Sequence, residues 1–274
     1  MKIQVRSDLH LEFGKPTHIP NLGADVLILA GDVMTAVNLR QFTREDVVLP
    51  HEVNRGVKAT AYREFLDMVS RDFKHVIYVA GNHEFYHGKF FEDLKTLKDE
   101  CTLNYGNIHF LENDSVTIDG ITFVGATLWT NCNGLDAVTM QTLQFGMNDY
   151  RIIKYDATPN QYSALRPKNS VERHIQSLQY INAEVAKHDK VVVVTHHAPT
   201  FKSIDPQYVN DQEFNGGYAS DLSNLILDHP NIKLWCHGHI HAKNDYMVGT
   251  TRVYANPMGY PGTLDSTDEV IDVA

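Results

Sequence analysis

The sequence of 274 residues has few cysteines, no long apolar run and no excess of basic charge. Its three cysteines, Cys101, Cys132 and Cys236, are too few and too scattered for a disulfide framework or a thiolate metal site. Free thiols in a reducing compartment are therefore expected. No apolar run approaches the roughly 20 residues of a membrane-spanning helix, and the first residues lack the apolar segment of a signal peptide. We expect a cytoplasmic protein without a membrane partner.

Acidic residues outnumber basic ones, 34 to 24, which gives a formal net charge of −10 at pH 7. A nucleic-acid surface usually shows a basic balance or stripe, so the composition argues against a nucleic-acid partner. It does not argue against a phosphate ester as substrate, because bound cations can reverse the local sign of charge. The 15 histidines are the unusual part of the composition, and their positions carry the functional argument.

Several short apolar runs rich in β-branched residues end in polar residues, a pattern typical of buried strands. These runs are Lys2–Val5, Asp25–Ala30, His75–Ala80, Lys190–Thr195 and Ile232–Cys236. Apolar residues at helical spacing predict helices between them, at Thr60–Phe73, Phe90–Glu100 and Val171–Lys187. An α/β fold of two sheets packed face to face, with helices on the outside, fits this alternation.

Two segments depart from the strand–helix alternation. Asn107–Val124 is interpreted as three strands joined by tight turns, because Asp119-Gly120 between apolar runs is a strong hairpin signal. Thr127–Lys168 has no clear period, and long irregular segments in compact domains are usually functional or disordered. Its aromatic residues disfavour disorder. Since nothing marks a linker or a repeat, we expect a single domain over residues 1–274 with a substrate-side insertion at about residues 127–168.

Polar side chains of ligand type follow the ends of five predicted strands, at the edge where α/β sheets bind ligands. They are Asp8, His10, Asp32, Asn82, His83, His196, His197, His239 and His241. Residues i and i+2 of an extended segment share a side, so two of these pairs can each point at one place. Each fragment alone could arise by chance. The joint arrangement indicates a use, because unpaired buried polar groups cost free energy.

The residue types indicate the kind of site. Carboxylate, amide and imidazole groups without thiolate suit Mn, Fe, Zn or similar divalent ions. Seven ligands exceed the needs of one tetrahedral ion and suit two ions that share a carboxylate. Two ions about 3.5–4 Å apart can clamp a phosphoryl oxygen and generate hydroxide at neutral pH. The sequence therefore predicts two divalent metal ions as cofactors, held by ligands from among these residues at the strand ends.

The motifs D-L-H, G-D, G-N-H-E, H-H-A-P and G-H-I-H occur in this order between Asp8 and His241. This series resembles the calcineurin-like metallophosphoesterase superfamily. The resemblance implies a four-layer α-β-β-α sandwich and hydrolysis of a phosphate ester by a metal-activated hydroxide. It implies that Asp32 bridges the two ions and is catalytic. It implies one ion on Asp8, His10, Asp32 and His241, and the other on Asp32, Asn82, His196 and His239. His83 matches the family's histidine that protonates the leaving group or steadies the phosphate.

One departure from the family's motifs argues against the protein Ser/Thr phosphatase branch. The protein Ser/Thr phosphatases read G-D-x-x-D-R-G at the second motif, whereas this chain has neither the second Asp nor the Arg after Gly31-Asp32. The G-H-x-H ending is instead similar to the phosphodiesterase-type branches. We expect a small phosphate ester, either a diester or a monoester, as substrate. A nuclease of the same superfamily and a catalytically silent binding or scaffold relative are the alternatives; no ligand position is lost, and the acidic charge disfavours the nuclease.

Several assignments remain open in the sequence. His197 could replace His196 as ligand or contact the substrate, although the H-x-x-P form of the family favours His196. The insertion is expected to fold over the metal edge and to contribute substrate contacts; its aromatics could instead only cover the outer face of a sheet. The candidate contacts are Trp129, Asn148, Tyr150 and Arg151. His237 and Glu84 are expected to support the site without binding metal.

Overall fold

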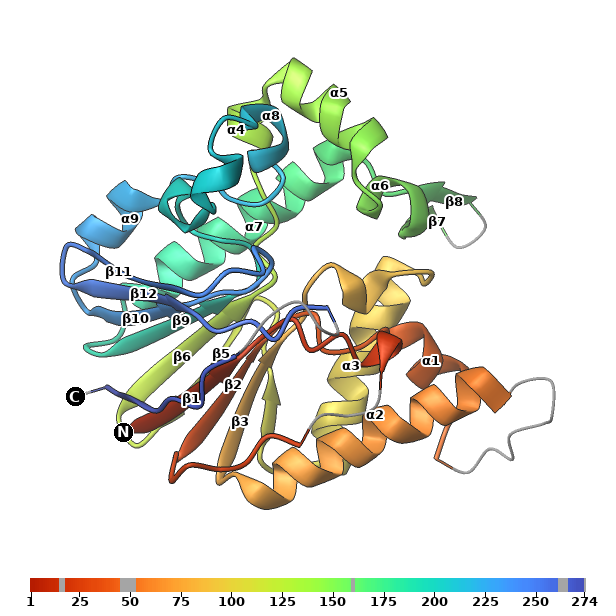
Figure 1. The fold of residues 1–274 in the computed structure, drawn as a ribbon, viewed down its shortest axis with the longest axis vertical. Helices are drawn as coiled ribbons and strands as arrows, with labels where there is room; N and C mark the ends of the chain where they lie inside the picture. The colour runs from red at the N-terminus through yellow and green to blue at the C-terminus, as the bar shows by residue number, and fades with distance from the viewer. Residues whose placement is uncertain (15–17, 45–52, 159–160, 261–265, 274) are drawn as a thin grey trace.

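The computed structural model describes residues 1–14, 18–44, 53–158, 161–260 and 266–273. Two large sheets lie face to face, and helices cover both outer faces (Figure 1). The expected four-layer α-β-β-α sandwich is confirmed. The two chain ends lie close together at the lower left of that view.

The first sheet has the strand order β13-β1-β2-β3-β4. Strands β1, β2, β3 and β4 run parallel, and the edge strand β13 is antiparallel to β1. The strands are β1 (Lys2–Arg6), β2 (Val26–Ala30), β3 (His75–Val79), β4 (Ile108–Phe110) and β13 (Ile271–Asp272).

The second sheet has the order β11-β12-β10-β9-β6-β5, with antiparallel hairpins at both edges and parallel pairs between them. The strands are β5 (Asp114–Ile118), β6 (Ile121–Ala126), β9 (Val191–Thr195), β10 (Ile232–Cys236), β11 (Asn244–Val248) and β12 (Thr251–Ala255). Strands β1, β2, β3, β9 and β10 end at one edge of the sandwich.

Helices cover the first sheet on one side and the second sheet on the other (Figure 1). The first group is α1 (Ala36–Gln41), α2 (Val53–Asp72) and α3 (Phe90–Asn104); the second is α7 (Pro167–Val185) and α9 (Ser223–Asp228). No helix in the described ranges is long and apolar enough to cross a bilayer.

The remaining elements are short and gather mostly at the ligand-bearing edge. They are η1 (Leu11–Phe13), η3 (His83–Phe85), α4 (Cys132–Leu135), α5 (Ala137–Gly146), α6 (Asp149–Ile152), β7 (Lys154–Thr158), β8 (Gln161–Ala164), η4 (Phe201–Ser203), η5 (Pro206–Tyr208) and α8 (Gln212–Asn215). Helices α4, α5 and α8 lie together beyond one end of the second sheet.

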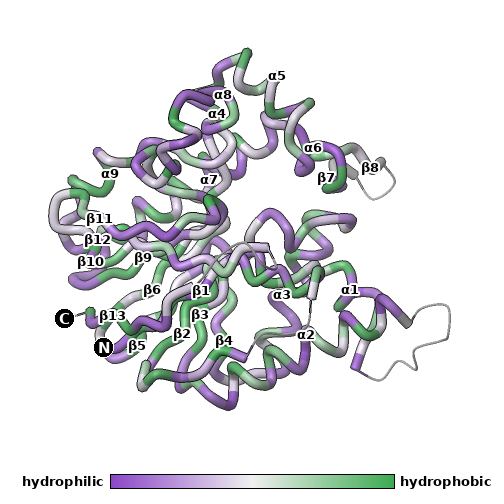
Figure 2. Tube along the Cα trace, viewed as in Figure 1, coloured by the Kyte–Doolittle hydropathy of each residue, from purple (hydrophilic) through white to green (hydrophobic). Residues whose placement is uncertain are grey.

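Alternation along the central strands divides the core into three layers. In β2, Ile28 belongs to the cluster between the sheets, whereas Leu27 and Leu29 pack toward the first helical layer. In β9, Val192 faces the first sheet and Val193 faces α7 and α9. Strands buried on both faces read as continuous apolar runs, which is why these strands were visible in the sequence (Figure 2).

The three strands expected in Asn107–Val124 are confirmed as β4, β5 and β6, with the hairpin between β5 and β6; β4 pairs with β3 in the opposite sheet. One sequence interpretation needs correction. The insertion at 127–168 is more regular than expected, with α4, α5, α6 and the β7–β8 pair; residues 159 and 160 lie outside the described residues. Helix α5 was missed because Val138 and Phe145 are 60% and 73% exposed, which blurs its apolar face.

Phe123 in β6 lies fully buried between the two sheets. Phe123→Ala should lower the free energy of unfolding by about 3–5 kcal/mol, since it removes apolar contacts and leaves a cavity. Leu103→Ala on α3 is the control: Leu103 is 80% exposed, and its loss should change stability by about 0.5 kcal/mol or less. Urea denaturation measures both. Equal effects would contradict a tightly packed layer between the sheets.

Candidate metal centre

The loops after β1, β2, β3, β9 and β10 bring all seven expected ligands to one edge of the sandwich. Each strand is held in register with its neighbours, so the loops start from fixed positions. Backbone bonds continue this order beyond the strands, for instance from Asp8 N–H to the Gly31 carbonyl and from Gly238 N–H to the His196 carbonyl. The positions of the ligands therefore follow from the sheet architecture.

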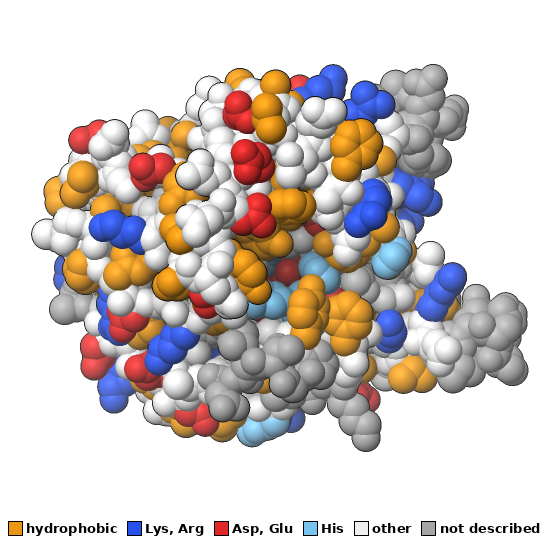
Figure 3. All heavy atoms as spheres, turned by 45° about the horizontal axis from the view of Figure 1, so that its top comes forward, with side chains coloured by type: hydrophobic (Ala, Val, Ile, Leu, Met, Phe, Trp, Pro, Cys, Tyr) orange, Lys and Arg blue, Asp and Glu red, His pale blue; other side chains and the backbone are white. Residues whose placement is uncertain are grey.

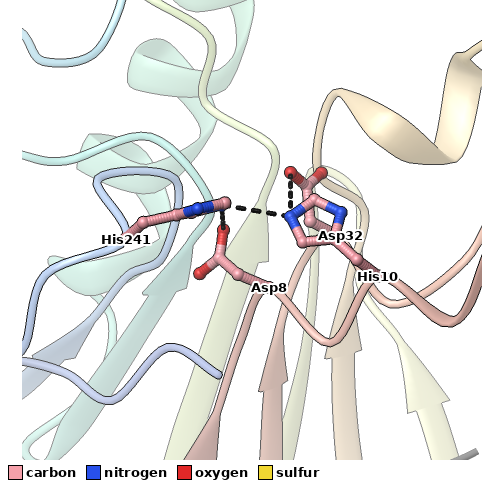
Figure 4. Close-up of side chains that lie close together, drawn as sticks. All are labelled: Asp8, His10, Asp32 and His241. Atoms are coloured by element: carbon pink, nitrogen blue, oxygen red, sulfur yellow. Dashed lines mark hydrogen bonds and ion pairs between the residues drawn. The ribbon is translucent and has the colours of Figure 1, made fainter. Parts of the chain in front are cut away.

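The first group of ligands comprises Asp8, His10, Asp32 and His241 (Figure 4). One ligand atom from each lies within 4.8 Å of the others. The Nε2 atoms of His10 and His241 are 3.0 Å apart, and His241 Nε2 is 3.3 Å from an Asp8 oxygen. Two imidazole nitrogens and two carboxylates that converge in this way suit a divalent cation.

The second group shares Asp32 with the first and adds His196 and His239 within the same 4.8 Å limit. Asn82 joins this group, because His196 Nε2 lies 3.0 Å from the Asn82 side-chain oxygen and 3.3 Å from an Asp32 oxygen. The Nε2 atom of His239 is buried and has no hydrogen-bond partner among the described residues. Leaving such an atom unpaired is costly, and a metal ion would satisfy it. The residues present therefore fit a pair of metal ions.

His196 and His197 point in different directions. His196 Nδ1 lies 2.9 Å from the Ala30 carbonyl, which leaves Nε2 for a metal ion. His197 Nδ1 lies 3.2 Å from the Thr127 carbonyl, and its ring packs between Trp129 and His239. Burial lowers the pKa of His197 to about 3, so its imidazole is neutral. The geometry favours His196 as the ligand.

Five of the ligand residues have backbone conformations that side chains rarely adopt. Their φ angles are positive: Asp8 54°, His10 47°, Asp32 54°, His239 68° and His241 53°. Strain of this kind collects at functional sites and persists only where the surrounding structure enforces it. Two glycines leave room for these side chains. A Cβ at Gly81 would collide with the Asp32 carboxylate, and one at Gly31 with the His196 ring.

The Glu84 carboxylate fixes the loops that carry Asp32 and Asn82. It accepts hydrogen bonds from the backbone N–H groups of Asp32 at 3.0 Å, Val33 at 2.7 Å and Gly81 at 2.7 Å, and from the Tyr78 hydroxyl at 2.8 Å. Burial, and then the Asp32 charge, raise the pKa of Glu84 to about 7. Glu84 thus supports the two loops through hydrogen bonds, as expected from the sequence.

Two further carboxylates, not singled out in the sequence, hold site residues in place. Glu12 Oε1 lies 2.8 Å from His83 Nδ1 and 3.1 Å from His10 Nδ1. Asp149 accepts a 2.8 Å bond from the Asn82 amide, which directs the Asn82 oxygen toward the second ligand group. Glu12 could have been suspected because it follows His10 by two residues. The role of Asp149 could not be seen in the sequence, because Asp149 lies 67 residues from Asn82.

His83 belongs to neither of the two groups that share Asp32. With His10 and Glu12 it forms a third group of potential ligand atoms within 4.8 Å of one another. Its Nε2 is 4.0 Å from an Asp32 oxygen, and its ring stacks on Tyr86 with centroids 4.0 Å apart. Burial alone would lower the pKa of His83, but the Asp32 and Glu12 carboxylates raise it to about 9. The protonated imidazole is therefore favoured at neutral pH while these carboxylate charges are uncompensated. A protonated His83 would present its Nε2 hydrogen on the side of the two ligand groups.

A cavity of about 570 Å³ opens at the ligand groups. Figure 3 shows the hollow, with histidines and an acidic side chain at its base and apolar side chains around it. Asp32, Asn82, His83, His239 and His241 line it, and the other side is formed by residues of the 204–218 segment and of the α5–α6 turn.

The structure corrects two proposed substrate contacts. Trp129 and Tyr150 are only 2% and 3% exposed, belong to the apolar core and do not line the cavity. Their large rings pack inward because burying aromatic area is favourable. Asn148 does line the cavity. Arg151 is exposed and donates a 2.8 Å hydrogen bond to the Asn148 side chain, so it supports a lining residue.

Comparisons with known proteins agree with this geometry. The family model described as calcineurin-like phosphoesterase matches residues 1–243. An uncharacterised protein of Acanthamoeba polyphaga mimivirus, L509, is 28% identical over 211 residues, which is 72% of each chain. The phosphopantetheinyl hydrolase of Mycobacterium tuberculosis superposes with a TM-score of 0.62 at 17% identity, covering 95% of this chain and 90% of the other. A dimetal phosphatase from Danio rerio gives 0.50 at 13%, with 93% and 87% covered. At these identities, both solved structures show a shared fold.

Metal binding should depend on Asp32 and not on His197. Mn²⁺ or Zn²⁺ at about 100 times its dissociation constant should stabilise the wild-type chain by about 2.7 kcal/mol. Asp32→Asn should abolish this gain, because both ligand groups lose a charged member, whereas the control His197→Asn should keep it. Elemental analysis and thermal unfolding with and without metal measure the effect. Metal binding that survives in Asp32→Asn, or in His196→Asn, would contradict the assignment.

Proposed function

The chain belongs to the calcineurin-like phosphoesterase family, and from this premise we propose that it hydrolyses a small phosphate ester at a centre of two metal ions. Family membership makes the protein a metal-dependent phosphoesterase. The count of two ions is supported by one observation above all: the Asp32 carboxylate belongs to two distinct groups of ligands, one with Asp8, His10 and His241, the other with His196 and His239.

The residues of the site contribute either charge to the metal ions or the orientation of another residue. When bound, divalent cations supply Lewis acidity toward a phosphoryl oxygen and lower the pKa of water. Asp8 and Asp32 provide fixed negative charge for them, and Asp32 N–H and Gly81 N–H are pinned by Glu84 so that the loops do not shift. The Asn82 amide is oriented by Asp149. Preorganised groups of this kind cost no reorganisation during reaction.

His83 is the proposed proton donor to the departing alcohol. It lies in the cavity lining and keeps its Nε2 toward Asp32 while Glu12 holds Nδ1 at 2.8 Å. A carboxylate on one imidazole nitrogen fixes the ring and stabilises its protonated form. General acid catalysis of this type contributes about 10²–10⁴-fold when the leaving group is poor. Glu12 is thus a positioning residue for His83.

The insertion supplies one side of the proposed substrate pocket through Gly146, Met147 and Asn148. The nuclease alternative is not favoured, because no Lys or Arg is found among the described residues that line the cavity. The three cysteines are buried and unpaired, which supports our proposal of a reducing, cytoplasmic location.

A substrate panel tests the proposed activity. Metal-loaded protein should hydrolyse at least one 4-nitrophenyl phosphate mono- or diester, and Asp32→Asn should reduce kcat/KM by at least about 10³-fold, since metal catalysis supplies most of the rate. Release of nitrophenolate is measured with Mn²⁺, Fe²⁺ and Zn²⁺ in turn. Absence of turnover with every metal and every ester would overturn the proposal.

His83→Ala should keep both metals and lose about 10²–10⁴-fold in kcat on an alkyl phosphate ester, but much less on a nitrophenyl ester, whose good leaving group needs no proton. Glu12→Gln should show the same leaving-group dependence in weaker form. His87→Asn is a matched control, because His87 is exposed and does not line the cavity. Equal losses on both esters would assign His83 a purely positioning role.

A further inference from the structure

The far wall of the cavity has an unusual composition for a phosphate-binding pocket. It is built by the 204–218 segment, which contributes Asp205, Tyr208, Asp211, Phe214 and Tyr218 to the lining. None of the described lining residues is Lys or Arg. The wall thus combines aromatic rings with carboxylates and has no cationic side chain to receive an additional anion.

This wall starts at the metal centre. The ring of Tyr218 stacks on His239 with centroids 4.7 Å apart. His239 is the residue whose buried Nε2 has no hydrogen-bond partner among the described residues and is available to a metal ion. Asp211 and Tyr218 line the same cavity as Asp32, His239 and His241. The Asp211 carboxylate therefore borders the space that a substrate at the metal site would occupy.

The wall is also held in shape. The buried Asn215 amide donates a 2.8 Å hydrogen bond to the Tyr208 carbonyl, and the Phe214 ring packs closely against Gly146, where a Cβ would collide with its Cζ. The Asp205 carboxylate caps η5 by accepting the Gln207 N–H at 2.9 Å. The Asp211 side chain has no hydrogen bond or ion pair to any described residue, so its charge is available to a ligand.

We propose that this wall selects phosphate esters whose alcohol carries a positive charge, that is, esters of amino alcohols, with Asp211 as the main determinant. The proposal rests on the proposed phosphoesterase activity. The phosphate would lie at the metal ligands, and the ammonium group would lie between the Asp211 carboxylate and the rings of Tyr208 and Phe214. Aromatic rings attract ammonium groups through their negative faces, and a nearby carboxylate adds a direct charge interaction.

The same features disfavour esters with a second anionic group. An additional phosphate or carboxylate on the alcohol would meet Asp205 and Asp211 without a compensating Lys or Arg in the described lining. The chain carries a net charge of −10, which adds long-range repulsion. Selection therefore has an attractive and a repulsive part.

The test compares substrates that differ only in charge. Phosphocholine and 3,3-dimethylbutyl phosphate have nearly the same shape, but only the first is cationic in its alcohol; each is assayed as the monoester and as the methyl diester. Wild-type protein should favour the choline ester by roughly tenfold in kcat/KM. In Asp211→Asn this preference should fall to about twofold or less, mainly through a higher KM for the choline ester.

Glu213→Gln is the matched control. Glu213 is two residues from Asp211 and has the same charge, but it lines a neighbouring cavity together with Asp136 and Phe201 and does not line the cavity at the metal ligands. This variant should keep the tenfold preference. Equal rates for the two esters in the wild type, or a preference that survives in Asp211→Asn, would overturn the inference.

The outcomes also separate the inference from the function beneath it. Hydrolysis of 4-nitrophenyl phosphate without any preference for the choline ester would overturn only the substrate class. Absence of metal-dependent hydrolysis of every ester would overturn both the activity and the inference. Loss of the preference in both Asp211→Asn and Glu213→Gln would indicate general charge effects and would count against a specific wall.

Discussion

The buried carboxylate of Asp32 is the constraint on which the rest of the site depends. It is 1% exposed, and burial alone would favour its neutral form. The charges of His196, His83 and His10 instead hold the pKa of Asp32 well below its ordinary value. A buried negative charge must be compensated, and here the imidazoles of His10, His83 and His196 lie around it. The positive φ angle of Asp32 and the absence of a side chain at Gly81 give the carboxylate room in this position.

Three further carboxylates maintain that shape, and each acts on a different part of it. Glu84 gathers backbone N–H groups from the loops after β2 and β3. Glu12 aligns His10 and His83, one a prospective ligand and the other a prospective acid. Asp149 reaches in from the insertion and turns the Asn82 amide. The positive φ angles of Asp32 and His10 are held by the bonds to Glu84 and Glu12, and Gly31 and Gly81 leave room for the neighbouring side chains.

The site separates general chemistry from selectivity. Residues at the ends of the parallel strands can hold metal ions and a phosphate group, whatever alcohol the phosphate carries. The cavity wall comes from the 204–218 segment and from the α5–α6 turn, both of which lie outside the strands. Loops on a rigid sheet can vary without disturbing the metal ligands. If the proposed activity holds, the charge and aromatic character of this wall are the features that would distinguish one substrate from another.

The sequence by itself determined the central strands β1, β2, β3, β9 and β10, the types of residue that follow them and their order along the chain. Strands such as Val191–Thr195 are buried on both faces and read as unbroken apolar runs, and ligand residues directly follow them. The pairing of β4 with β3, the placement of Trp129 and Tyr150 in the core, and the bond from Asp149 to Asn82 were decided only by the tertiary structure. These features depend on contacts between residues far apart in the chain, and local periodicity carries no information about such contacts. The structure likewise favours His196 over His197 as the ligand through a distant group: the Ala30 carbonyl lies at Nδ1 of His196, and the Nε2 of that ring lies toward Asp32.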